Sequence, residues 1–104
     1  MNTENETVRQ EPKQRESHTA AKEITIVNEL GLHARPAAEF VRCAGRFRSD
    51  VSLIKEGRRF SAASMMEVLL ADMECGQVAI VEAQGPDADA AVEALADLVQ
   101  NLRD

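Results

Sequence analysis

The residues with the clearest chemical potential are His33 and Arg35, in the stretch Gly-Leu-His-Ala-Arg-Pro-Ala-Ala that spans 31–38. A neutral imidazole is a nucleophile that can accept a phosphoryl group and pass it on. A guanidinium presents a planar fork of donors that matches a phosphate. If a helix begins here, the backbone amides of Ala34 and Arg35 add to the site, because amides in a first helical turn lack intrahelical partners. The pattern therefore indicates a site for a phosphoryl group.

The neighbouring residues predict how this site is built. Gly31 allows a sharp turn out of the apolar run 24–27. Proline is tolerated in the first turn of a helix, so Pro36 places the helix start at Ala34, with His33 as the N-cap. Histidine is not a favoured N-cap, and the positive helix end disfavours an imidazolium. We therefore expect a neutral, nucleophilic His33; the alternative is a surface loop residue beside a solvated arginine.

A second motif lies at Ser64 and Glu67, which have the Ser-x-x-Glu spacing of a capping box. This spacing predicts a short helix that runs to about residue 71 or 72. Three apolar side chains of this helix are candidates for partner contact: Met65, Met66 and Leu69. Flexible thioethers suit a surface that binds several partners. We expect contacts from the first and the last of the three and leave Met66 open, with core packing as the alternative.

The remaining patterns predict the other elements. Residues 23–27 form a strand by their β-branched content, 50–55 and 58–62 form a hairpin around 56–57, and 78–83 form the last strand. Two amphipathic helices are predicted, one from Ala34 to about Gly45 and one that follows Asp87 as its N-cap. The order β-α-β-β-α-β-α predicts an α+β two-layer sandwich. Its four-stranded sheet, antiparallel or mixed, is covered on one face by the two longer helices.

Composition limits the class of protein. The 104 residues carry a formal net charge of −6, which argues against a nucleic-acid partner. No apolar run approaches the roughly 20 residues of a membrane span, and 1–14 contain no apolar segment of a secretory signal. Cys43 and Cys75 have no metal or redox spacing, so we expect reduced thiols and a cytoplasmic location. Two distant histidines complete no ligand set, so neither a metal nor a cofactor is expected.

Charge and polarity divide the chain into regions. Segment 34–59 has a local excess of basic residues, whereas the chain from 60 onward is strongly acidic. This division suggests that an acidic partner is steered to the basic side, although a surface of mixed sign is an equal alternative. Residues 1–21 are predicted to be a disordered N-terminal tail, in which His18 is inert, and 22–104 to be the folded domain.

Gly31-Leu-His-Ala-Arg-Pro-Ala37 resembles the active-site signature of HPr, the histidine-containing phosphocarrier protein of the sugar phosphotransferase system. The likeness extends from about Glu23 to Leu102. It implies an antiparallel sheet and a monomer that is not itself an enzyme. It also implies that enzyme I phosphorylates His33 on Nδ1, that Arg35 helps to hold the phosphate, and that enzyme IIA proteins receive the group. The output would be sugar uptake or a regulatory branch.

The resemblance also bears on Ser64, which aligns with the serine that HPr kinase/phosphorylase modifies in many members. A phosphate at a helix N-cap faces free amides and the positive end of the helix. Glu67 departs from the glycine or lysine that is common in the family, and its carboxylate would repel a phosphate. Leu30 also departs from a small polar residue found in some members. The alternative function is therefore a contact-dependent regulatory module, switched by phosphorylation of Ser64.

Overall fold

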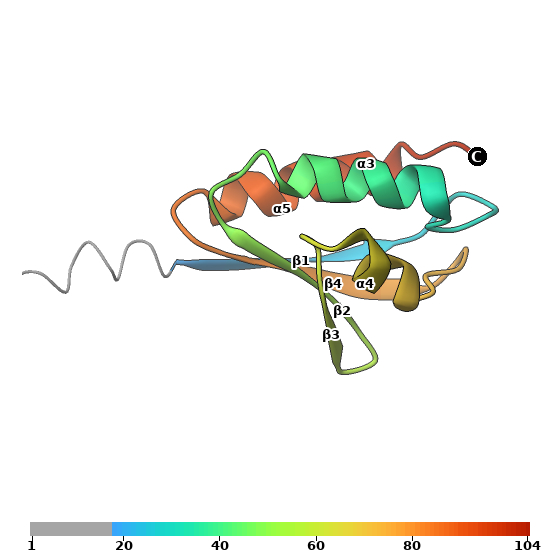
Figure 1. The fold of residues 1–104 in the computed structure, drawn as a ribbon, viewed down its shortest axis with the longest axis horizontal. Helices are drawn as coiled ribbons and strands as arrows, with labels where there is room; N and C mark the ends of the chain where they lie inside the picture. The colour runs from blue at the N-terminus through green and yellow to red at the C-terminus, as the bar shows by residue number, and fades with distance from the viewer. Residues whose placement is uncertain (1–17) are drawn as a thin grey trace, which may run out of the picture.

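The computed structural model describes residues 18–104, in which the elements follow the predicted order. The strands are β1 (Thr19–Thr25), β2 (Asp50–Lys55), β3 (Arg58–Ser61) and β4 (Val78–Gln84), and the helices are α3 (Ala34–Ala44), α4 (Met65–Leu70) and α5 (Ala88–Gln100). The strands form one sheet in the order β1-β4-β2-β3, and each neighbouring pair is antiparallel. Helices α3 and α5 lie side by side over one face of this sheet (Figure 1). The α+β two-layer sandwich is confirmed, in its antiparallel form.

The core fills the space between the sheet and the helices. Leu53 of β2 lies opposite Phe60 of β3, and both are buried together with Val51, as the alternation of the hairpin predicted. The helices contribute their apolar stripes to the same core. The largest fully buried side chains come from every layer: Phe40, Ile26, Leu53, Leu95, Val68, Val81 and Val99. This continuous core holds α3 rigidly on the sheet, and with it the residues at the start of α3.

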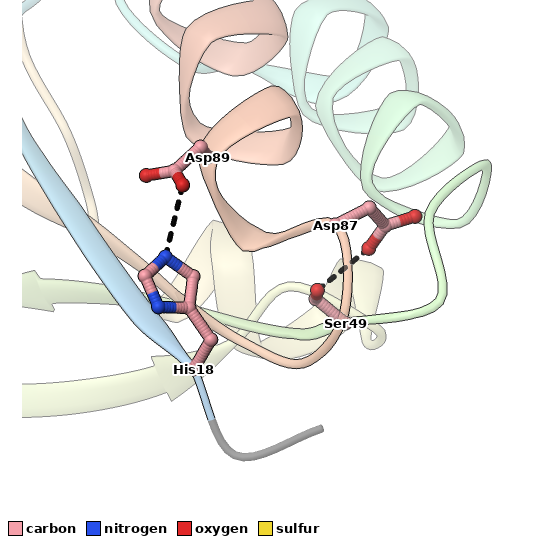
Figure 2. Close-up of polar contacts among 4 residues, drawn as sticks. All are labelled: His18, Ser49, Asp87 and Asp89. Carbon is pink, nitrogen blue, oxygen red and sulfur yellow. Dashed lines mark hydrogen bonds and ion pairs between the residues drawn. The ribbon is translucent and has the colours of Figure 1, made fainter. Parts of the chain in front are cut away.

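Strand β1 begins at Thr19, so the predicted end of the tail at residue 21 is wrong for Thr19–Ala21. These residues pair with β4, from Thr19 opposite Gln84 onward. Two side-chain contacts join this end of the chain to α5: a hydrogen bond of 2.9 Å between His18 Nε2 and the Asp89 carboxylate, and an ion pair of 2.9 Å between Lys22 Nζ and the Glu93 carboxylate. His18 is therefore a structural contact rather than part of an inert tail (Figure 2). The rest of the predicted tail, 1–17, lies outside the described residues.

Asp87 occupies the predicted N-cap position of α5, but its side chain does not cap the helix. Its carboxylate accepts a hydrogen bond of 2.6 Å from the Ser49 hydroxyl (Figure 2) and one of 2.9 Å from the Arg48 amide. The hydroxyl and then the amide lower the pKa of Asp87, because they stabilise the ionised carboxylate. Asp87 therefore ties the loop before α5 to the loop before β2.

Candidate phosphoryl site at the start of the first helix

His33 is the N-cap residue of α3, as predicted, with φ −77° and ψ −170°. Its carbonyl oxygen accepts the first helical hydrogen bond, from the Ala37 amide at 2.9 Å, but its imidazole makes no capping bond. Pro36 stands in the first turn, where its missing N–H does no harm. The amides of Ala34 and Arg35 have no intrahelical acceptor, so they are free to receive an anion beside the imidazole.

The two ring nitrogens of His33 have different surroundings. The residue as a whole is half-buried, yet Nε2 is completely covered and has no hydrogen-bond partner among residues 18–104. A covered nitrogen cannot react with an external group without rearrangement. Of the two ring nitrogens, Nδ1 is therefore the candidate for reaction with an external group.

A cavity of about 350 Å³ opens beside His33. Its walls come from the start of α3 and from the end of α5 with the residues that follow it: His33, Arg35, Pro36, Glu39, Leu98, Asn101, Leu102 and Arg103. Arg35 is exposed, and no carboxylate in the described part of the chain pairs with its guanidinium. The structure therefore brings His33, Arg35 and Pro36 together at one cavity.

The loop that precedes His33 is built around Gly31, which has a φ of +70°. A Cβ atom at this position would overlap the backbone carbonyl oxygen of Met73, against which the loop packs. The Leu32 amide donates to that same oxygen at 2.9 Å. Only glycine combines this dihedral with this close approach, so Gly31 sets the path that carries the chain to His33.

A polar cluster around the buried Asn28 supports the same loop and was not predicted from the sequence. Asn28, which is 4% exposed, donates through Nδ2 to the Gly31 carbonyl at 2.7 Å and to the Asp104 carboxylate at 3.0 Å. The Leu30 amide donates to the same Asp104 oxygen at 3.0 Å. The Leu30 amide is the largest cause of the lowered pKa of Asp104. In the sequence, the position of Asn28 directly after an apolar run indicated this cluster only weakly, and nothing indicated Asp104.

The predicted capping box of Ser64 and Glu67 is confirmed in part. Ser64 is the N-cap of α4, and its hydroxyl accepts from the Glu67 amide at 3.2 Å. The reciprocal half of the predicted capping box is wrong, because the Glu67 carboxylate accepts from the Ser61 amide at 2.8 Å instead of from Ser64. The loop between β3 and α4 brings the Ser61 amide within reach, which the spacing alone did not reveal. Helix α4 also ends at Leu70, slightly before the predicted end.

Helix α4 exposes the apolar side chains that were candidates for partner contact. Met65 is 37% exposed and Leu69 is 40% exposed, while Met66, at 71%, is the most exposed of the three. Leu70, at 66%, belongs to the same surface and was not predicted. Core packing is therefore excluded as the main role of these side chains, and their contact with partners stays a prediction.

Other candidate chemistry is not supported within residues 18–104. Both cysteines are free; Cys43 is buried, and burial raises the pKa of its thiol, whereas Cys75 is exposed. The described residues contain no cluster of histidine, cysteine and carboxylate side chains that could hold a metal ion. None of the helices in this part of the chain is long and apolar enough to cross a membrane.

Comparisons with known proteins agree with this geometry. Residues 20–101 match the family model described as the PTS HPr component phosphorylation site. The chain is 39% identical to the phosphocarrier protein HPr of Cupriavidus necator over 80 residues, which is 77% of this chain and 90% of that one. It is 35% identical to the phosphocarrier protein NPr of Shewanella violacea over 78 residues, which is 75% and 86% of the two chains. The crystal structure of HPr from Bacillus anthracis superposes with a TM-score of 0.75 at 36% identity, covering 79% of this chain and 98% of that one.

Proposed function

Because the chain belongs to the HPr family of phosphocarrier proteins of the phosphotransferase system, we propose that His33 is its phosphoryl acceptor and donor. As a phosphocarrier, the protein is not itself a catalyst; partner enzymes load and unload it. In the proposed cycle, enzyme I, itself phosphorylated from phosphoenolpyruvate, supplies the group, and an enzyme IIA-type protein receives it. We place this cycle in the cytoplasm.

The observation that carries the proposal is the uncapped imidazole of His33 beside a cavity that Arg35 also lines. In the loading step, the Nδ1 lone pair attacks phosphorus while the bond from phosphorus to the donor atom of enzyme I breaks. The bonding electron pair leaves with that donor atom. The Arg35 guanidinium and the amides of Ala34 and Arg35 then stabilise the phosphoryl oxygens. Unloading is the same displacement, with the acceptor protein as the nucleophile.

The test is phosphotransfer from purified enzyme I and phosphoenolpyruvate, with acid-labile phosphate as the readout. His18, the other of the two histidines, provides a control because it lies beside Asp89 at the start of α5, whereas His33 lies beside the end of α5. We expect one phosphoryl group per wild-type chain, the same amount in His18→Ala and none in His33→Ala. Label that survives in His33→Ala, or an unlabelled wild-type chain, would contradict the proposal.

The output of the cycle is sugar uptake or a regulatory branch. Relatives named HPr and relatives named NPr are similar to this chain at comparable sequence identity, 39% and 35%. Incubation of the phosphorylated chain with candidate enzyme IIA proteins decides between them. Transfer to a sugar-specific acceptor supports uptake, and transfer only to an acceptor without a transported sugar supports the regulatory branch.

A second function is supported by the surface of α4. The exposed side chains of Met65, Met66, Leu69 and Leu70 follow Ser64 directly, so a phosphate on Ser64 would alter a docking surface. HPr kinase/phosphorylase would be the modifying partner. The Glu67 carboxylate is held at the same helix end by Ser61 and opposes this modification electrostatically. A contact-dependent regulator would keep its regulatory effect after His33→Ala and change its affinity for its partner after Ser64→Asp. A pure carrier would lose its whole function with His33→Ala.

A further inference from the structure

The residues after α5 bring a second guanidinium to the cavity beside His33. Arg103 lines this cavity, together with Leu102 and Asn101. Arg35 and Arg103 are far apart in the sequence, so only the fold brings the two guanidinium groups to the same cavity. In Figure 1 the end of α5 and the start of α3 lie at the same end of the molecule.

The position of Arg103 is fixed by anchors on both sides. On one side, the Leu102 side chain is only 9% exposed, and its amide donates to the Val99 carbonyl at 3.2 Å. On the other side, the Asp104 carboxylate accepts hydrogen bonds of 3.0 Å from the Leu30 amide and from Asn28 Nδ2. Because both neighbours are held, the backbone at Arg103 stays beside the loop that leads to His33.

The charges of the cavity suit a dianion. Arg35 and Arg103 contribute two guanidinium groups, and among the described residues Glu39 is the only one that lines the cavity with a carboxylate. The Asp104 carboxylate does not line the cavity but interacts electrostatically with His33, and its hydrogen bonds from Leu30 and Asn28 engage it. No ion pair within residues 18–104 engages either guanidinium, so both are available to a ligand. A phosphoryl group on a half-buried imidazole has three oxygens to satisfy, and charge-assisted hydrogen bonds from arginine are strong and geometrically matched to it.

We propose that Arg103 is a second phosphate-binding residue, which holds the phosphoryl oxygens of phospho-His33 from the part of the cavity wall that follows α5. This inference rests on the proposed function, since it requires that His33 carries the phosphoryl group. Arg103 donates hydrogen bonds and transfers no proton. Its effect is to stabilise the phosphoryl group in transit and to lower the pKa of the bound phosphate.

The test compares Arg103→Gln and Arg103→Lys with Arg58→Gln, an exposed arginine in the β2–β3 hairpin that lies over the Phe60 ring and does not line the cavity. Each chain is phosphorylated by enzyme I, and the phosphate is titrated by ³¹P NMR. We expect Arg103→Gln to lower kcat/KM for phosphorylation about tenfold and to raise the phosphate pKa by about 0.5 unit, because a nearby positive charge is lost. Arg103→Lys should restore the pKa but only part of the rate, and Arg58→Gln should match the wild type.

The two proposals fail in different ways. If Arg103→Gln has the rate and the phosphate titration of the wild type, while Arg35→Gln changes both, Arg103 does not bind the phosphate and the proposed function stands. If the wild-type chain carries no phosphate, or carries it in His33→Ala, the proposed function fails and this inference fails with it. The Arg103 side chain is exposed and makes no ion pair within residues 18–104, so the two Arg103 variants should keep the Tm of the wild type.

Discussion

The substitution Gly31→Ala tests how the loop before His33 is built. Gly31 has a φ of +70°, and a Cβ there would overlap the Met73 carbonyl oxygen. Gly57, in the β2–β3 turn, has a similar φ of +80° but open space around its Cβ position. Comparison of Gly31→Ala with Gly57→Ala therefore separates the free-energy cost of a positive φ from the cost of the close approach to Met73.

The expected magnitudes follow from these two costs. Alanine in the left-handed region costs about 1.5 kcal/mol, which is the whole cost for Gly57→Ala. For Gly31→Ala the Met73 backbone must also move away, which weakens its hydrogen bond from the Leu32 amide. This adds about 1 to 2 kcal/mol and brings the total to about 3 kcal/mol. In a domain of this size, these values lower the Tm by roughly 6–12 °C for Gly57→Ala and roughly 12–24 °C for Gly31→Ala.

Thermal unfolding followed by circular dichroism measures both shifts, and phosphorylation by enzyme I at a temperature where both variants are folded adds a second readout. Gly31→Ala should slow phosphorylation, because Leu32 and His33 must shift with the loop, whereas Gly57→Ala should not. Equal losses of Tm in the two variants would refute the argument, since the packing against Met73 would then cost nothing.

Three further predictions concern the scaffold. Asp87→Asn should destabilise the protein at neutral pH and make its free energy of unfolding depend less on pH in acid. Because folding lowers the pKa of Asp87, its carboxylate stabilises the fold fully above pH 3.8, and this stabilisation is lost as the pH falls through the pKa of the folded state. Urea unfolding between about pH 2 and 6 will measure the difference. Ser64→Ala should cost about 1 kcal/mol through the lost bond to the Glu67 amide, as urea unfolding at pH 7 will show. Phe40→Ala should cost about 3 to 5 kcal/mol, because Phe40 is completely buried; an unchanged urea midpoint would contradict its place in the core.

The parts of the fold that were predicted correctly are those with local causes. Pro36 and the apolar stripe of the first long helix defined its start, its N-cap His33 and its end near Gly45. The hairpin was equally local, with alternating residues on both sides of the Glu56-Gly57 turn. The candidate site has the same local character, since His33, the Arg35 guanidinium and the amides of the first helical turn are adjacent in sequence.

The parts that were missed depend on contacts between distant segments. The start of β1 has no apolar alternation of its own, and its pairing with β4 and the ion pair of Lys22 with Glu93 hold it in place. The Glu67 carboxylate accepts from the Ser61 amide because the loop between β3 and α4 brings this amide within reach. Asn28 and Asp104 meet only because α5 returns the chain to the start of α3, so no local pattern could reveal their hydrogen bond or the place of Arg103.

The most direct measurement of the central claim is the NMR spectrum of the His33 ring nitrogens in ¹⁵N-labelled protein, recorded before and after phosphorylation by enzyme I and phosphoenolpyruvate. The covered Nε2 and the uncapped imidazole predict a phosphorus coupling at Nδ1 and a ring proton retained on Nε2. A phosphorus coupling at Nε2, or unchanged His33 resonances in a chain that has taken up phosphate, would contradict the account.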